Sequence, residues 1–327
     1  MKINSFSISF KGYDVAPLKA VHIEQSTGGP IKAELKKIAQ QENFELRQGL
    51  DYYRWPQDTK TIIEKNKKPF IVANGLVGDE YLEETAKKYG IKGTSISFIT
   101  VGGNSFIGKY PNGERFMLVG EDEFEGRTID NTAEAYGIER KNIIPIPQQN
   151  YHLDVFMRPI GYPYILIDNP KLTRQKLTQL NKKGYLSQYL NLQKDFNSEE
   201  LKRSMKYASH TKTVEALKKA GFIPIEIAGV YSRGINFMNA IVNSHPDGTI
   251  SYITNSTSCK NPFISKLQEE FEADLRKKVP NIDKVYFVSG QKDIQTENLN
   301  YMMYNLNKRG GGLHCMTLEE VDFDAWG

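Results

Sequence analysis

A thiol lies beside unusually free backbone in the stretch Arg309-Gly310-Gly311-Gly312-Leu313-His314-Cys315-Met316-Thr317. Glycine has no Cβ, so three in a row let the chain adopt positive φ angles and let another group approach closely. Leu313 and Cys315 alternate with His314 and Met316, which predicts a short strand with two different faces. We therefore expect Cys315 at the end of a strand, as the candidate nucleophile beside a substrate-binding loop.

The composition is that of a globular protein without a strongly charged partner. The 327 residues carry a formal net charge of only +4, dispersed along the chain, which argues against nucleic acid as a partner. Residues 1–10 alternate apolar and polar side chains, which predicts a strand and no cleavable signal peptide. No apolar run is long enough for a transmembrane segment, and no membrane partner is expected. Cys259 and Cys315 are far apart and predict free thiols, so we expect a cytoplasmic protein or one exported without a cleavable signal peptide.

One unit of strand, helix, loop and strand recurs along the chain. Its first copy, in residues 18–75, has a strand at 21–23, a strand at 70–73 and, between them, a helix with apolar residues at helical spacing: Ile31, Leu35, Ile38 and Ala39. Two hairpins are predicted, one around Asn112-Gly113 and one around Asp247-Gly248. Strands thus alternate with helices, but not all of them can be parallel.

This alternation predicts an α/β protein, and the hairpins predict mixed sheets and not a purely parallel wound sheet. No Gly-x-Gly-x-x-Gly or phosphate loop is present, so no nucleotide cofactor is expected. Residues 171–205 break the rhythm with a Lys- and Gln-rich helical stretch. We interpret this stretch as a helical insertion in a single catalytic domain that spans 1–327.

Two further stretches carry candidate catalytic groups: Trp55-Pro56-Gln57-Asp58 and His152-Leu153-Asp154. If His152 and Asp154 lie on a strand, their side chains point to the same face. Each candidate also has a purely structural interpretation. Asp58 could cap a turn, His152 could be half-buried, and Cys315 could be a small buried apolar residue.

If the stretches converge, the site holds a thiol, an imidazole and two carboxylates. Two carboxylates in one pocket repel each other unless a cation lies between them. A guanidinium suits them, because its paired N–H donors match carboxylate oxygens two at a time. A metal site is less favoured, because one His and two Asp lack the usual ligand spacing. A thiol with a pKa of about 8.5 is largely protonated at neutral pH, and a neighbouring cation raises its thiolate fraction.

Together these three stretches resemble the motifs of the guanidine-modifying (pentein) superfamily. The glycine-rich cysteine stretch is similar to the family's C-terminal cysteine motif, and His152-Leu153-Asp154 to its His-x-Asp element. Trp55-Pro56-Gln57-Asp58 resembles the Trp-x-Gln-Asp of the peptidylarginine deiminases, and agmatine deiminases are the other close branch. The order along the chain is also the family's order.

The resemblance implies a five-bladed α/β propeller of ββαβ-type units around a central pocket. It also implies roles: Cys315 attacks the guanidinium carbon, His152 protonates the leaving ammonia and later activates water, and Asp58 and Asp154 hold the guanidinium nitrogens. A covalent thiouronium intermediate is then hydrolysed to a ureido product. We expect Trp55, Gly311 and Gly312 to contribute to substrate binding.

Two departures from the family pattern affect these expectations. Agmatine and arginine deiminases usually carry an acidic residue where this chain has Val101, which favours the peptidylarginine branch. Thr59 and Thr61 replace acidic residues that help bind calcium in the vertebrate peptidylarginine enzymes, so no cofactor is expected and calcium is not favoured. The acidic run 121–125 reads as a solvated loop, and Cys259 as an ordinary thiol.

The sequence therefore predicts a hydrolase that converts arginine side chains of a protein or peptide to citrulline. The alternative is a deiminase of agmatine or another free guanidine. An amidinotransferase and a non-catalytic guanidinium-binding module remain as further alternatives. The oligomeric state is left open.

Overall fold

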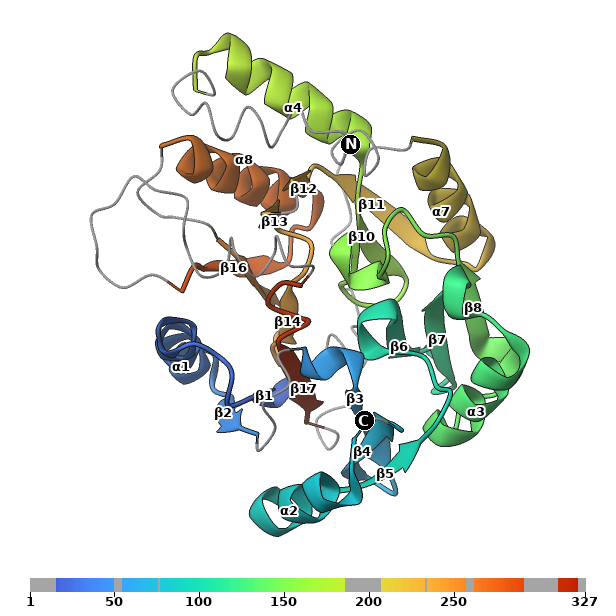
Figure 1. The fold of residues 1–327 in the computed structure, drawn as a ribbon. Coiled ribbons are helices and arrows are strands. Elements are labelled where there is room, and N and C mark those ends of the chain that lie inside the picture. Colours follow the sequence, from blue (N-terminus) through green and yellow to red (C-terminus); the bar gives the residue numbers. More distant parts are fainter. Residues whose placement is uncertain are drawn as a thin grey trace.

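The computed structural model describes residues 16–49, 55–75, 77–185, 207–232, 234–256, 262–290 and 311–322. Within these residues the strands form five three-stranded sheets and one two-stranded sheet. Figure 1 shows the strands toward the centre of the molecule and the helices around its periphery. The predicted α/β class with mixed sheets is confirmed.

The three-stranded sheets share one topology. In each, the middle strand pairs antiparallel with one neighbour and parallel with the other. With the antiparallel partner first, the sheets are β17 (Thr317–Val321), β1 (Leu18–Ile23) and β2 (Glu45–Gln48); β3 (Lys60–Lys65), β4 (Lys68–Asn74) and β5 (Lys92–Ile96); β6 (Ser105–Lys109), β7 (Arg115–Gly120) and β8 (Ile143–Ile146); β9 (Met157–Pro159), β10 (Tyr164–Asp168) and β11 (Ile223–Ile227); β14 (Ile241–Ser244), β15 (Ile250–Asn255) and β16 (Ile282–Val288). The short β12 (Val230–Ser232) pairs with β13 (Ile235–Asn236).

Helices connect the two parallel strands of each sheet, as a crossover requires. They are α1 (Gly29–Glu42), α2 (Asp79–Tyr89), α3 (Gly126–Tyr136), α8 (Pro262–Lys278) and, between β10 and β11, α4 (Pro170–Lys182) and α7 (Tyr207–Lys219). Short 3₁₀ helices are η2 (Pro56–Asp58), η3 (Gly102–Asn104), η4 (Glu121–Glu123), η5 (Arg140–Asn142) and η6 (Leu153–Val155).

Local sequence explains where α1 begins and ends. Pro30 lies in its first turn, where a missing N–H costs no helical hydrogen bond, and Asn43 ends it in the left-handed region at φ 59°. The apolar residues predicted at helical spacing are all buried: Ile31, Leu35, Ile38 and Ala39. The same holds for α8, whose residues Phe263, Leu267, Phe271 and Leu275 lie in one hydrophobic cluster.

The sheet that contains β1 joins the two ends of the described chain. Leu18 pairs with Val321 and Ile23 pairs with Thr317, in antiparallel register. All five residues of β17 are buried. The turn that carries Cys315 directly precedes β17, so this buried strand fixes its position.

The structure corrects two of the predicted strands. Leu313 to Met316 form a turn, with Met316 N donating to Leu313 O at 3.2 Å, and the strand begins only at Thr317. His152 and Asp154 do not share a strand either. Asp154 lies in η6, closed by a hydrogen bond from Phe156 N to Leu153 O at 3.1 Å.

Of the remaining predictions, some can be compared with the structure and others concern residues that the structure does not describe. Both predicted hairpins are present, as β6–β7 and β14–β15. The proposed insertion begins with α4, and its remainder from 186 lies outside the described residues, as do Cys259, Arg309 and Gly310. None of the described helices is both long enough and apolar enough to cross a membrane.

Candidate active site

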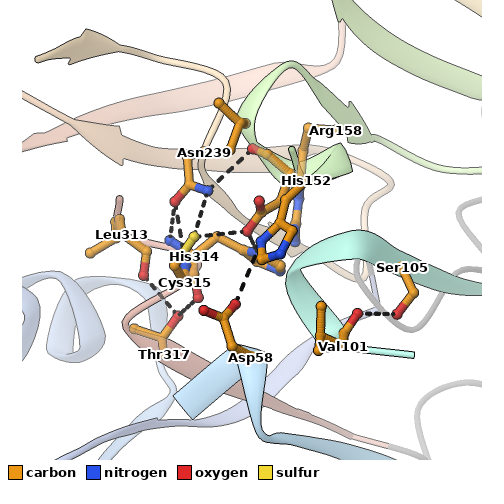
Figure 2. A network of polar contacts seen from close by, with 12 residues as sticks. Asp58, Val101, Ser105, His152, Arg158, Asn239, Leu313, His314, Cys315 and Thr317 are labelled. Atoms are coloured by element: carbon orange, nitrogen blue, oxygen red, sulfur yellow. Dashed lines mark hydrogen bonds and ion pairs between the residues drawn. The ribbon is translucent and has the colours of Figure 1, made fainter. Parts of the chain in front are cut away.

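Three short segments carry the candidate residues: η2 contains Asp58, η6 contains Asp154 and directly follows His152, and the turn before β17 contains Cys315. Figure 2 shows Asp58, His152 and Cys315 close together. Gly103 in η3 lies among them. A Cβ at Gly103 would be 2.8 Å from Nδ1 of His152 and 2.9 Å from Oδ1 of Asp58. Only a glycine allows this approach, because real Cβ contacts are essentially never below 3.0 Å. The four predicted catalytic residues therefore lie in one place.

Asn239 fixes the turn that carries Cys315. Its Oδ1 accepts hydrogen bonds from His314 N at 2.8 Å and Cys315 N at 3.3 Å, and its Nδ2 donates to Cys315 Sγ at 3.1 Å. On the same turn, Leu313 N donates to Asn255 Oδ1 at 2.7 Å. Asn239 is buried, so these bonds are protected from water. The thiol therefore has a fixed position.

The thiol is buried against a carboxylate. Cys315 is 2% exposed, and its Sγ lies 3.0 Å from Oδ2 of Asp154. Burial raises the pKa of Cys315 well above its usual value, and the negative charges of Asp154 and Asp58 raise it further. With no cation bound between these groups, Cys315 is a thiol at neutral pH.

Asp154 remains ionised although it is fully buried. Burial alone would raise its pKa, but the hydrogen bond and the charge of His314 outweigh burial, so the pKa lies below its usual value. Oδ2 contacts both His314 Nδ1, at 2.8 Å, and the thiol. Oδ1 is buried and has no hydrogen-bond partner within the described part of the chain. A buried unpaired carboxylate oxygen is costly, which makes it a ready acceptor for a bound cation.

His152 and Asp58 form the more open edge of the site. Their side chains are 19% and 24% exposed, with Nδ1 of His152 3.6 Å from Oδ1 of Asp58. Burial, and then the charge of Asp154, raise the pKa of Asp58 to about 7. Burial lowers the pKa of His152 despite the opposing effect of Asp154, so the imidazole is neutral at pH 7.

The residues expected to bind substrate pack against each other. A Cβ at Gly311 would lie 2.5–2.8 Å from three atoms of the Trp55 indole. Gln57 N also donates to Cys315 O at 3.4 Å. Gly311 and Gly312 are buried and Trp55 is half-buried. The Trp55–Asp58 segment and the cysteine turn are thus in direct contact.

The acidic run 121–125 is not wholly a solvated loop. Glu123 is half-buried, and its Oε2 accepts a hydrogen bond from Val101 N at 3.0 Å. Burial raises its pKa, and its charge raises the pKa of Asp58. A carboxylate from η4 therefore lies beside the backbone of Val101 and acts electrostatically on Asp58.

Sequence reasoning missed four residues of the site: Asn239, His314, Glu319 and Arg158. The sequence contains only weak indications that these residues belong to the site. His314 stands next to the cysteine, but the predicted strand assigned it to the opposite face. Arg158 and Glu319 are fully or almost fully buried charged residues, a property that becomes visible only in the fold.

The arrangement suits a small planar cation better than a metal. Within the described residues no group of three or more His, Cys, Asp and Glu side chains could hold a metal ion. The site instead combines a buried thiol, a carboxylate with one unpaired oxygen, a second carboxylate and a neutral imidazole. These groups can perform nucleophilic attack on a carbon whose substituents are N–H donors.

No protein-family model and no curated protein matches the sequence. The fold, in contrast, matches solved structures over nearly its whole length. The agmatine deiminase of C. jejuni superposes with a TM-score of 0.58 at 17% identity and covers 98% of each chain. SxtG, an amidinotransferase from Microseira wollei, gives a TM-score of 0.52 at 11% identity over 95% of this chain and 96% of that chain. The N-terminal domain of ArgZ, a cyanobacterial arginine dihydrolase, gives 0.50 at 12% identity over 92% and 96%. At these identities the likeness establishes the fold.

Proposed function

From a chain that has the pentein fold of the guanidine-modifying enzymes, we infer a cysteine-dependent hydrolase of guanidinium groups. One observation carries this proposal. The Sγ of Cys315 touches Oδ2 of Asp154, while Oδ1 of the same carboxylate is buried without a partner in the described residues. A guanidinium that donates to Oδ1 would place its central carbon next to the thiol.

The proposed reaction has two halves. Cys315 first loses its proton and attacks the guanidinium carbon, which gives a tetrahedral adduct. Transfer of a proton from His152 to one nitrogen releases ammonia and leaves a cationic S-alkylthiouronium. Water then loses a proton to His152 and adds to the same carbon, and the C–S bond breaks. The products are a ureido compound and the free cysteine.

Electrostatics link substrate binding to activation of the thiol. Without substrate, the carboxylates keep the pKa of Cys315 well above its usual value. A bound guanidinium adds a positive charge between Asp58, Asp154 and the thiol, which lowers the pKa of Cys315. The neutral imidazole of His152 can accept the released proton. The thiolate would therefore form mainly in the complex, which protects the free enzyme from oxidation.

We propose a free guanidine such as agmatine as the substrate class. The absence of an acidic residue at Val101 favoured arginine within a polypeptide, but the carboxylate of Glu123 lies beside the backbone of Val101. A second acidic group near Asp58 suits a substrate with a second positive charge. The similar C. jejuni structure is named as an agmatine deiminase, which supports the same choice. Peptidyl-arginine remains the second candidate, because Trp55-Pro56-Gln57-Asp58 matches the motif of that branch.

The experiment measures ammonia release from agmatine, free arginine and an arginine peptide blocked at both termini, at equal pH. We expect agmatine to have the highest kcat/KM. A tenfold advantage for the blocked peptide, about 1.4 kcal/mol, would assign a polypeptide substrate. Ammonia-free transfer to an added amine would indicate an amidinotransferase. Cys315→Ala should abolish turnover while the circular dichroism spectrum stays unchanged, and appreciable ammonia release by this variant would refute the mechanism.

We also propose that the five three-stranded sheets are the five blades of a propeller. The pairing of β1 with β17 supports this, because it places the two ends of the described chain in one sheet. In such a ring the site would lie at the centre, where η2, η6 and the cysteine turn meet.

A further inference from the structure

Four buried charged groups form a row behind the candidate nucleophile: Asp154, His314, Glu319 and Arg158. Asp154 Oδ2 lies 2.8 Å from Nδ1 of His314, and Nε2 of His314 lies 3.4 Å from Oε2 of Glu319. Oε1 of Glu319 accepts a hydrogen bond from Nη2 of Arg158 at 2.8 Å. The side chains of Asp154, His314 and Arg158 are 0% exposed and that of Glu319 is 5% exposed. Carboxylates and bases thus alternate along the row.

The sum of charges in this row depends on His314. With an imidazolium, two anions face two cations and the row is neutral. With a neutral imidazole, one negative charge would remain uncompensated among buried side chains, which is strongly unfavourable. A carboxylate lies beside each ring nitrogen: Nδ1 makes a hydrogen bond to Asp154, and Nε2 lies at ion-pair distance from Glu319 without a hydrogen-bond partner in the described residues. Only the imidazolium carries an N–H toward both carboxylates. The geometry therefore selects the imidazolium.

The other neighbours of His314 do not reverse this preference. They are Cys315, the ring of Phe106 at a centroid distance of 5.8 Å, and the more distant Asp58. Burial lowers the pKa of His314 and Arg158 opposes its charge, but Glu319 and Asp154 outweigh both and raise the pKa to about 9. Phe106 also faces the guanidinium of Arg158, 5.5 Å from the ring centroid. Thus the two carboxylates outweigh the opposing effects and favour a cationic His314.

We propose that His314 is a positioning residue for the reaction: a permanent buried imidazolium that keeps Asp154 ionised and turns its free oxygen toward the substrate guanidinium. His314 does not touch the substrate. It acts through Oδ2 of Asp154, whose other oxygen has no partner in the described residues. Glu319 contacts His314 from the other side, and Arg158 in turn donates to Glu319. This inference rests on the proposed role of Asp154 in guanidinium binding.

The protonation state can be measured without any turnover. The chain has five histidines, so ¹⁵N side-chain NMR of the whole protein gives a small set of signals, and His314→Gln identifies the one that belongs to His314. We expect both nitrogens of His314 to be protonated at pH 7.5. Glu319→Gln should make the proton leave at lower pH. A neutral His314 at pH 7.5 in the wild-type protein would overturn the proposal.

Kinetics test the effect on Asp154. Without the imidazolium, the pKa of Asp154 rises, so His314→Gln should increase KM tenfold or more at pH 6.5. The ratio of variant to wild-type KM should shrink as pH rises to 9, because Asp154 then ionises without help. A purely structural defect would lower kcat at a KM ratio independent of pH, and that result would refute the proposal.

A matched control is available in β1. His22 pairs with Glu320 through Nε2 and Oε2 at 2.8 Å, and its side chain is 5% exposed. His22→Gln removes a buried histidine from an ion pair outside the site, and its KM should stay within twofold of wild type at every pH. If the control shows the same pH-dependent KM ratio, the effect is not specific to Asp154. If the proposed function itself is wrong, Cys315→Ala will still release ammonia, while the protonation of His314 measured by NMR will be unchanged.

Discussion

Gly311→Ala should damage both stability and activity, because a Cβ has no room at this position. The added atom would lie 2.5 Å from Cζ3, 2.7 Å from Cε3 and 2.8 Å from Cη2 of Trp55. Ordinary van der Waals contact begins at 3.4 Å, so the indole or the cysteine turn must move by about 1 Å. The indole is a rigid ring and cannot avoid the contact by rotating a flexible end. Overpacking of this kind costs about 1–3 kcal/mol.

The same displacement reaches the chemistry. Trp55 directly precedes η2, which carries Asp58, and Gly311 is four residues from Cys315. A misplacement of about 1 Å between reacting groups lowers rates by about 100-fold. We therefore expect kcat/KM for agmatine to fall between tenfold and 100-fold. Urea unfolding should give a lower midpoint with an unchanged slope.

Two further variants make this prediction specific. Gly126→Ala adds the same methyl group in the first turn of α3, where a Cβ meets nothing within 4 Å, so it should leave activity unchanged and stability equal or slightly higher. Trp55→Phe removes the outer ring atoms that a Cβ at Gly311 would touch. In the double variant the methyl group should cost at least about 1 kcal/mol less than in the wild-type background. If Gly311→Ala behaves like Gly126→Ala in both assays, the argument from close packing is refuted.

Three other changes test the electrostatics of the site. Because the pKa of Asp58 is about 7 and its charged form holds the guanidinium, kcat/KM should rise with pH through this range. Asp58→Asn should remove that rise and cost about 2–4 kcal/mol of transition-state stabilisation. An unchanged kcat/KM would show that Asp58 does not bind the guanidinium. Asn239→Asp keeps the shape of the side chain but replaces the Nδ2 donor to Cys315 Sγ by a negative charge. Alkylation of Cys315 by iodoacetamide should therefore require higher pH than in wild type. An unchanged pH profile of alkylation would contradict the contact between Asn239 and Sγ. Because Thr59 and Thr61 stand where calcium-binding carboxylates were expected, activity should persist in excess chelator, and a large loss restored by calcium would disprove this.

The local features of the fold could be predicted from the sequence because short-range physical chemistry determines them. The spacing of Ile31, Leu35 and Ile38 follows the period of a helix that buries one face, and α1 has that face. The turns at Asn112-Gly113 and Asp247-Gly248 join paired antiparallel strands, because only such residues readily adopt tight hairpin turns.

The candidate residues could also be selected from the sequence, but not their geometry. Thiol, imidazole and carboxylates identify themselves by their chemistry, and Asp58, His152, Asp154 and Cys315 do lie together. Alternation is a weak signal over four residues, so the strands predicted for His152–Asp154 and Leu313–Met316 were wrong. Hydrogen bonds to Asn239 favour a turn at the cysteine instead.

Only the tertiary structure decided which charges stabilise the site. Arg158, Glu319 and His314 are ordinary charged residues in the sequence, and their importance comes from burial and from contacts between β9, β17 and the cysteine turn. Glu123 likewise reaches the backbone of Val101 from a separate segment, and its charge raises the pKa of Asp58. Electrostatic energy depends on the distance between groups and on their exposure to water. Neither the distance nor the exposure is determined by neighbours in the chain. The sequence therefore identifies the reacting groups, and the tertiary structure determines their charge states.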